Sequence, residues 1–187
     1  MCSIFMRYKK DELSALDKIY VATALLIKNI GYNDFNCSSI IKAANISRST
    51  FYFYFKNKDQ VIIYICDDIF NNIFKKEKNQ DFLSYSASEL KDMLVKSFFY
   101  FLDEREIVIS ILNSNASNIF MSRLRKRLKP FIASMMNKKL IGNNSIPEEI
   151  KTHQYINGYT ALLQYYLRHG YNISPEQICD YYFSFYK

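Results

Sequence analysis

Glycine and proline are scarce in this sequence, with 4 and 3 occurrences in 187 residues. Tight turns draw mainly on these two residue types, so the chain has few turns and long segments between them. Long segments favour helices over a fold of many short strands. Hydrophobic residues still make up 49% of the chain, which is enough to form a core and excludes global disorder.

Long apolar runs and closely spaced cysteines are also missing. The longest apolar stretches, such as Tyr20 to Ile27, are far too short to cross a bilayer. The first ten residues lack the apolar segment and cleavage site of a signal peptide. We therefore expect no membrane partner and a cytoplasmic protein with reduced thiols. The four cysteines are scattered without CxxC spacing: Cys2, Cys37, Cys66 and Cys179.

Sequence patterns that carry catalysis are absent as well. The chain has no glycine-rich phosphate loop, no HExxH and no GxSxG. The two histidines, His153 and His169, are sixteen residues apart and form no close pair with a cysteine or an acid. A metal site would therefore need long-range contacts. We expect no enzymatic activity, no cofactor and no metal.

Two short helices are predicted between residues 36 and 54. Asn36 is a suitable N-cap for the first, which ends at Ala44. Asn45 follows and tolerates the positive φ of a sharp turn. Ser47 then caps the second helix, Arg48 to about Tyr54. Two short helices joined by a turn of about three residues form a helix-turn-helix, whose second helix lies in the major groove of DNA.

Aromatic residues fill most of this second helix. Phe51 and Phe55 lie four residues apart and are expected to face the core, while Tyr52 and Phe53 lie on the outer side. A tyrosine hydroxyl can bond a phosphate, and an aromatic edge can rest on a thymine methyl. Arg48 can form two hydrogen bonds with guanine. The predicted DNA contacts are Asn36, Ser38, Ser47, Arg48, Ser49, Thr50, Tyr52, Phe53 and Lys58.

Charge is distributed in agreement with this interpretation. Residues 1–60 hold 9 Lys and Arg against 5 Asp and Glu, whereas the remainder holds 16 against 13. A basic surplus suits a polyanionic partner. Lys58 begins the next predicted helix, where its cation and the helix N-terminus are both placed to meet a phosphate.

At these residues the sequence resembles the TetR family of one-component transcriptional regulators. The family's first helix, of the type I-x-x-A-A-x-x-L-F-x-x-x-G-Y, is matched by Ile19, Ala22, Leu26, Ile27, Gly31 and Tyr32. Its helix-turn-helix pattern continues along residues 36–58. The departures are physically mild: Asn36 for Thr, Ile41 for Ala, Asn45 for Gly and Ser49 for Gly. Residues 154–178 also resemble the C-terminal region of a Firmicutes-type subgroup.

The resemblance implies an all-α fold of about nine helices in two domains. Residues 1–57 would form the helix-turn-helix domain, and residues 58–187 a helical effector-binding and dimerisation domain with a connecting helix at 58–78. It implies a ligand-responsive repressor that binds double-stranded operator DNA as a homodimer and answers to a small-molecule effector of unknown identity. The alternative is a helix-turn-helix regulator controlled by a protein partner.

The C-terminal half offers candidates for both further sites. The resemblance implies that the last two helices, Pro147–Gly170 and Pro175–Tyr186, pair across a two-fold axis. The predicted dimer contacts are Gly158, Leu163, Leu167, Ile178, Tyr182 and Phe185. Aromatic residues are the candidates for the wall of an apolar effector pocket: Phe98, Phe120, Tyr155 and Tyr159. The basic cluster at 123–129 is either a solvated helix face, a site for an anionic effector, or a contact for an acidic surface.

Overall fold

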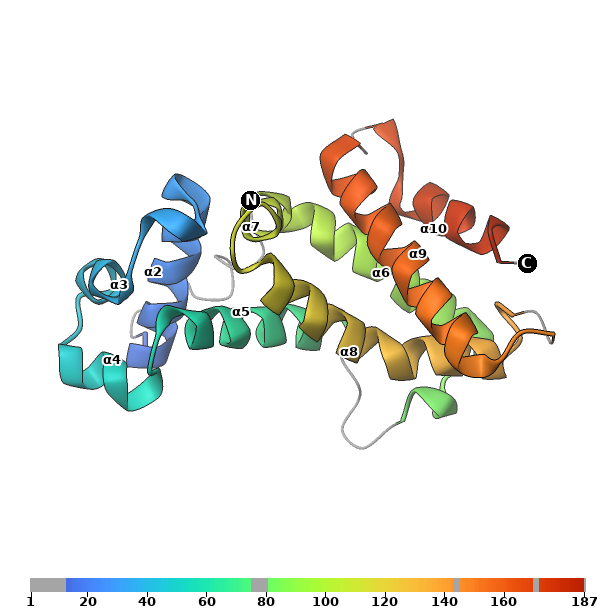
Figure 1. Ribbon diagram of the computed structural model, residues 1–187, viewed down its shortest axis with the longest axis horizontal. Helices are drawn as coiled ribbons and strands as arrows, with labels where there is room; N and C mark the ends of the chain where they lie inside the picture. The colour runs from blue at the N-terminus through green and yellow to red at the C-terminus, as the bar shows by residue number, and fades with distance from the viewer. Residues whose placement is uncertain (1–12, 75–80, 143–144, 170–171, 187) are drawn as a thin grey trace. The chain divides into compact units, whose positions relative to one another are not determined.

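The computed structural model describes residues 13–74, 81–142, 145–169 and 172–186, and these residues form nine α-helices, two short 3-10 helices and no β-strand (Figure 1). The predicted all-α fold, with a helix-turn-helix followed by a helical C-terminal region, is confirmed. None of the helices in the described residues is long and apolar enough to span a membrane.

Three helices near the N-terminus pack around a small core. Their caps mark where each begins: Ser14 and Asp17 form a capping box ahead of the first, and Asn36 and Ser39 form another ahead of the second. Gly31 ends the first helix with φ at +82°, a positive value that suits glycine. The elements are α2 (Ala15–Ile30), η1 (Tyr32–Asp34), α3 (Cys37–Ala44) and α4 (Arg48–Tyr54).

Helix α5 (Lys58–Ile73) follows directly. The sequence predicts that it runs to about Lys78; the described helix ends at Ile73, and residues 75–78 lie outside the described part of the chain. The remaining elements are η2 (Phe82–Ser84), α6 (Ala87–Asp103), α7 (Arg105–Leu112), α8 (Ser117–Asn137), α9 (Glu148–His169) and α10 (Pro175–Ser184).

By packing, the described chain divides into two compact units. The first holds the residues up to Ile69 together with 103–123, and the second holds 70–102 together with the residues from Leu124 onward. Helices α5 and α8 therefore each contribute to both units. The predicted boundary between residues 57 and 58 separates a DNA-binding domain from an effector-binding domain by function, and it stays a prediction.

Polar contacts attach α7 to the end of α2 within the first unit. The Ser110 hydroxyl donates to the Ile27 carbonyl over 2.9 Å, and Lys28 pairs with Glu106 at 2.7 Å. The backbone amide of Asn115 donates to the side chain of Asn33 over 3.2 Å. The three-helix head is thus anchored on a segment that the sequence places some 80 residues away.

The core of the second unit is aromatic. The ring of Phe98 lies 5.0 Å from that of Tyr159 and 5.8 Å from that of Tyr166, measured between centroids. Hydrogen bonds satisfy two of the buried hydroxyls: Tyr159 shares one with Ser97 at 2.8 Å, and Tyr182 donates to the Tyr155 carbonyl over 3.1 Å. Burial strongly raises the pKa of the Tyr159 hydroxyl, so it stays protonated and acts as a neutral partner.

Candidate functional site

The turn between α3 and α4 is built by Asn45. This residue takes the left-handed conformation, with φ at 50° and ψ at 55°, as predicted for it. The amide of Ile46 then donates to the Ile41 carbonyl over 3.3 Å, which closes the end of α3. Phe51 is fully buried and Phe55 is buried beside it, with their ring centroids 6.1 Å apart. These buried rings fix the orientation of α4 against the other two helices of the head.

Two of the predicted DNA contacts are helix caps. The side-chain oxygen of Asn36 accepts a hydrogen bond from the Ser39 amide at 3.1 Å, and that of Ser47 accepts one from the Thr50 amide at 3.0 Å. The Ser47 hydroxyl also lies 2.8 Å from the hydroxyls of Ser49 and Thr50. Asn36 and Ser47 therefore set the starts of α3 and α4, which positions the residues that follow them.

Five of the other predicted contacts share an exposed surface, which we call the α4 face: Ser38, Arg48, Ser49, Tyr52 and Phe53. Arg48 donates to the Ser38 hydroxyl over 3.4 Å, which brings the start of α3 against the start of α4. Phe53 is 82% exposed, an unusual state for such a large apolar side chain. Thr50 is partly buried beneath this face.

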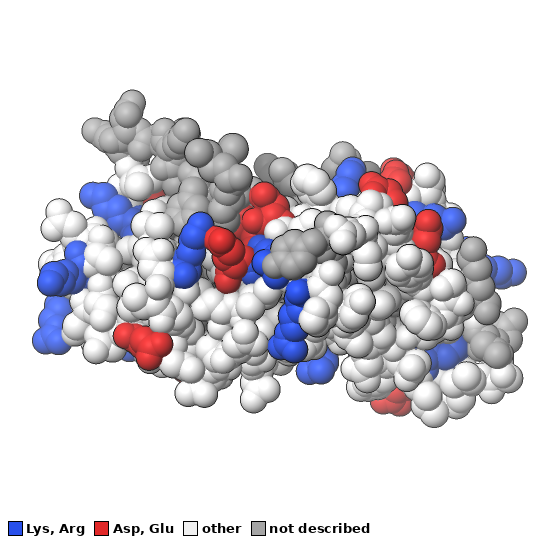
Figure 2. All heavy atoms as spheres, turned by 90° about the horizontal axis from the view of Figure 1, so that it is seen from above, with Lys and Arg blue, Asp and Glu red and all other residues white. Residues whose placement is uncertain are grey.

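Cations that the sequence analysis did not single out lie near the α4 face. Lys42 on α3 and Lys56 after α4 are both exposed. Figure 2 shows Lys and Arg side chains at the end of the molecule that carries α3 and α4, on the left in Figures 1 and 2. Exposed lysines outside a motif carry no spacing signal, so the sequence does not indicate them as DNA contacts.

Lys58, which the sequence predicts to meet a phosphate, has its ammonium group engaged within the chain. Its ammonium group donates to the backbone carbonyls of Tyr32 and Phe35, at 2.9 and 2.8 Å, and lies 4.2 Å from the centre of the Tyr32 ring. The hydroxyl of Tyr32 in turn donates to Asp59. Lys58 thus ties the loop between α2 and α3 to the start of α5, and two of its three donors are already used within the chain.

The four residues predicted to line an effector pocket do not all belong to one compact unit. Phe98 and Tyr159 are fully buried and packed against each other, and Phe120 belongs to the other unit. Tyr155 lines a groove of about 420 Å³, together with Ile150 and side chains at the end of α10. Phe98, Phe120 and Tyr159 are part of the buried core.

The predicted dimer contacts need a similar correction. Leu163, Leu167, Ile178 and Tyr182 are buried in the core of their own chain, where a partner's side chains do not reach them. Gly158 has an intrachain reason: a Cβ there would lie 1.9 Å from the Tyr186 hydroxyl. Of the predicted set, only Phe185 is a large exposed side chain, at 69%. Three other large side chains on α9 and α10 are exposed: Ile150, Tyr165 and Tyr181.

Thiols and metal-binding groups give no second site. Burial raises the pKa of Cys66 and of Cys179 to about 12, so both thiols stay protonated and unreactive at neutral pH. Cys37, considered as a redox sensor, is a partly buried free thiol at the first position of α3. Within the described ranges, no group of three or more His, Cys, Asp or Glu residues could hold a metal ion.

Comparisons with known proteins agree with this architecture. Residues 19–65 match the family described as bacterial regulatory proteins of the tetR family, and residues 88–186 match the family described as a transcriptional regulator C-terminal region. An uncharacterized HTH-type transcriptional regulator of Haemophilus influenzae is 32% identical over 77 residues. That match spans 41% of this chain and 40% of the relative.

Solved structures show the same fold over nearly the whole chain. A TetR transcriptional regulator from Streptococcus agalactiae superposes with a TM-score of 0.75 at 22% identity, covering 91% of this chain and 92% of its own. SmeT, described as the repressor of a Stenotrophomonas maltophilia efflux pump, has a TM-score of 0.68 in its complex with triclosan. That match has 14% identity and covers 93% of this chain and 92% of SmeT.

Proposed function

Because this chain belongs to the TetR family of bacterial transcriptional regulators, we propose that two copies bind one operator, with α4 of each copy in a major groove. The α4 face carries this proposal, since an arginine, a serine and two exposed aromatic residues lie on the first two turns of α4, and Ser38 on α3 lies beside them. Arg48 is the base-reading side chain, and Tyr52 and Phe53 contact sugar, phosphate or a thymine methyl.

The operator is found by selecting duplexes that bind from a random-sequence pool. Arg48→Ala should then lower affinity for the selected site by about 1–3 kcal/mol and relax base preference at one position. Lys96→Ala is the matched control, because it removes the same charge from an exposed position on α6. Unchanged affinity and base preference in Arg48→Ala would rule out base reading by this residue.

An exposed apolar face supports the proposed homodimer. It consists of Ile150 on α9, Tyr181 on α10 and Phe185 at the end of α10, and we call it the α9–α10 face. Tyr181 and Phe185 lie four residues apart and therefore on one side of their helix. Ile150 and Phe185 also line one groove, and a second copy provides a self-complementary partner for these exposed apolar side chains.

We propose that the protein represses transcription and that a small molecule bound in the second unit controls its binding to the operator. SmeT, which shares this fold, is described in complex with triclosan and as a repressor. The packed aromatic core around Phe98 argues against an effector among the predicted pocket residues. A groove between α8 and α9 is the better-supported place, because it offers open volume.

A further inference from the structure

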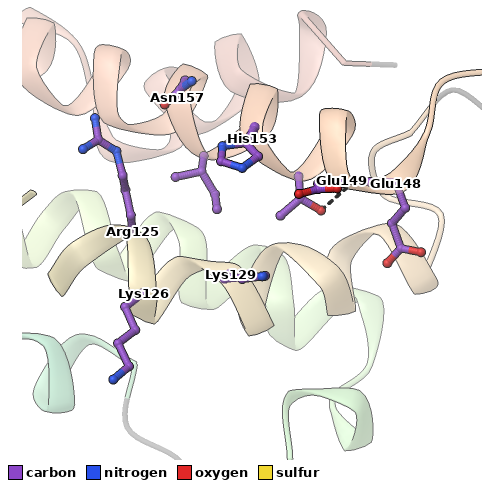
Figure 3. Close-up of a pocket in the computed structure, with 9 residues that line it drawn as sticks. Arg125, Lys126, Lys129, Glu148, Glu149, His153 and Asn157 are labelled. Atoms are coloured by element: carbon purple, nitrogen blue, oxygen red, sulfur yellow. Dashed lines mark hydrogen bonds between the residues drawn. The ribbon is translucent and has the colours of Figure 1, made fainter. Parts of the chain in front are cut away.

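The groove between α8 and α9 encloses about 480 Å³ (Figure 3). This volume falls within the roughly 300–1,000 Å³ typical of small-molecule sites. Its lining comes entirely from the second unit: Arg125, Lys126, Lys129, Glu148, Glu149, Thr152, His153, Ile156 and Asn157. The groove therefore lies within one compact unit, where both of its walls are fixed.

The floor of the groove is largely apolar. Ile156 and Thr152 are buried, whereas the other lining residues are exposed. The Thr152 hydroxyl donates to the Glu148 carbonyl over 2.8 Å, so its hydrogen-bonding need is met within α9. A ligand on this floor gains from burying apolar surface and displaces no hydrogen bond of Thr152.

The rim carries cations that have no partner among the described residues. Arg123, two residues before the groove, is paired with Asp67. Among the described residues, neither Arg125 nor Lys129 forms an ion pair or a hydrogen bond with another side chain. The basic cluster therefore splits into one structural arginine and a set of unpaired cations beside an open volume.

Hydrogen-bond donors gather at one end of the groove. Figure 3 shows Arg125 extending toward Asn157, with His153 and Lys129 next along the two helices. Guanidinium and ammonium groups are donors only, and an arginine fork fits a carboxylate with two parallel hydrogen bonds. These side chains call for a ligand with a negatively charged acceptor.

Acidic side chains occupy the opposite end. Glu148 and Glu149 lie in the first turn of α9, where carboxylates are favoured by the helix dipole. They have this structural role without any ligand, whereas Arg125 and Lys129 have no comparable role. A negative group at the Arg125 end also keeps its distance from both carboxylates.

We propose that this groove binds an amphipathic organic carboxylate. Its carboxylate contacts Arg125 and Lys129, and its apolar body lies over Ile156 and Thr152. This assignment deepens the effector part of the proposed function by naming the ligand class, and the binding step can be tested without DNA.

The probe is decanoate, titrated into the full-length protein by calorimetry. Decanol, with the same tail and no charge, should bind at least about tenfold more weakly, because the charged contacts are lost. Decylamine carries the opposite charge and should also bind more weakly. Stronger binding of decylamine, lost in Glu149→Gln, would assign the groove to a cation and overturn the proposal.

Variants locate the site. Arg125→Gln and Lys129→Gln should each weaken decanoate binding by about tenfold, because each removes a charge-assisted hydrogen bond. Lys138→Gln is the matched control, because Lys138 is an exposed lysine that does not line the groove; the affinity of this variant should stay within about threefold of wild type, as a screened surface charge allows. All three side chains are exposed, so folding should be retained, and circular dichroism checks this.

The ligand assignment and the proposed function fail in different ways. Absence of decanoate binding, or equal binding by wild type and Arg125→Gln, overturns the ligand assignment whatever the DNA results are. If the ligand-free protein selects no DNA sequence from the random pool, the proposed function is overturned instead. Binding of decanoate with operator affinity unchanged leaves the groove assigned and removes its regulatory role.

Discussion

At the scale of single residues, a shared position in a motif does not fix a shared role. Lys58 stands where the helix-turn-helix pattern has its lysine, and the pattern predicted a phosphate contact. The structure instead engages its ammonium group with the carbonyls of Tyr32 and Phe35. A lysine has a long flexible stem, so its direction depends on which acceptors lie within reach. The sequence spacing does not predict these two acceptors, because the carbonyls belong to a segment more than 20 residues earlier.

Lys58→Met keeps the aliphatic stem and removes the charge. We expect the free energy of unfolding to fall by about 1–3 kcal/mol, because two partly buried carbonyls lose a charged donor. The slope of operator affinity against salt concentration should stay unchanged. Urea denaturation and a salt series of DNA titrations measure the two effects.

Lys56→Met is the control, because Lys56 is exposed and lies two residues earlier. Its effect on stability should stay within about 0.5 kcal/mol, as for ordinary surface positions. The opposite pattern for Lys58→Met, a salt slope lower by about one with stability intact, would restore the phosphate contact.

At the scale of helices, caps were predictable and buried faces only partly so. The reciprocal capping bonds of Ser86 with Glu89 and of Ser174 with Gln177 follow from residue types three positions apart. Phe51 and Phe55 were assigned to the core from their spacing, and both are buried. These features depend on one helix alone, which is why sequence suffices for them.

The faces of α9 and α10 depend on neighbours and were not predictable in the same way. Each helix has apolar residues on more than one side, because one side packs in its own chain and another is left exposed. Leu163 and Tyr182 are buried in the core, whereas Tyr165 and Tyr181 are exposed. Residue type does not separate a tyrosine in the core from one on the surface, so most of the residues predicted for the interface lie in the core.

The turn of the helix-turn-helix gives a prediction at this scale. Asn45 holds φ at 50°, where a side chain other than Asn or Gly is strained. Asn45→Gly should leave stability within about 0.5 kcal/mol of wild type, while Asn45→Val should lower it by about 1–2 kcal/mol. Urea denaturation followed by circular dichroism measures both changes.

Ala43→Val is the matched control, because it introduces the same side chain at an exposed helical position two residues away. It should cost at most about 0.7 kcal/mol, the ordinary helix-propensity difference. Equal losses for Asn45→Val and Ala43→Val would mean that the left-handed conformation at the turn carries no special cost.

At the scale of the whole molecule, the proposed function requires two copies. Operators read by helix-turn-helix dimers have half-sites about 34 Å apart, on successive turns of the duplex. One head with seven residues in α4 reads only a few base pairs. Joining two heads through the α9–α10 face makes the second head's binding intramolecular, which raises the affinity above that of either head alone.

The double variant Tyr181→Glu with Phe185→Glu tests this arrangement. Two carboxylates on an apolar interface would be desolvated beside their two-fold mates, and like charges would meet across the axis. We expect wild-type protein at micromolar concentration to have twice the chain mass by light scattering, and the variant to have the chain mass. Because each copy then binds one half-site alone, affinity for the selected operator should fall by at least about a hundredfold.

Phe99→Glu is the control, because Phe99 is an exposed residue of α6 outside the α9–α10 face; it should change neither the mass nor the operator affinity. A variant that remains dimeric with both glutamates in place would show that the two copies meet through another surface.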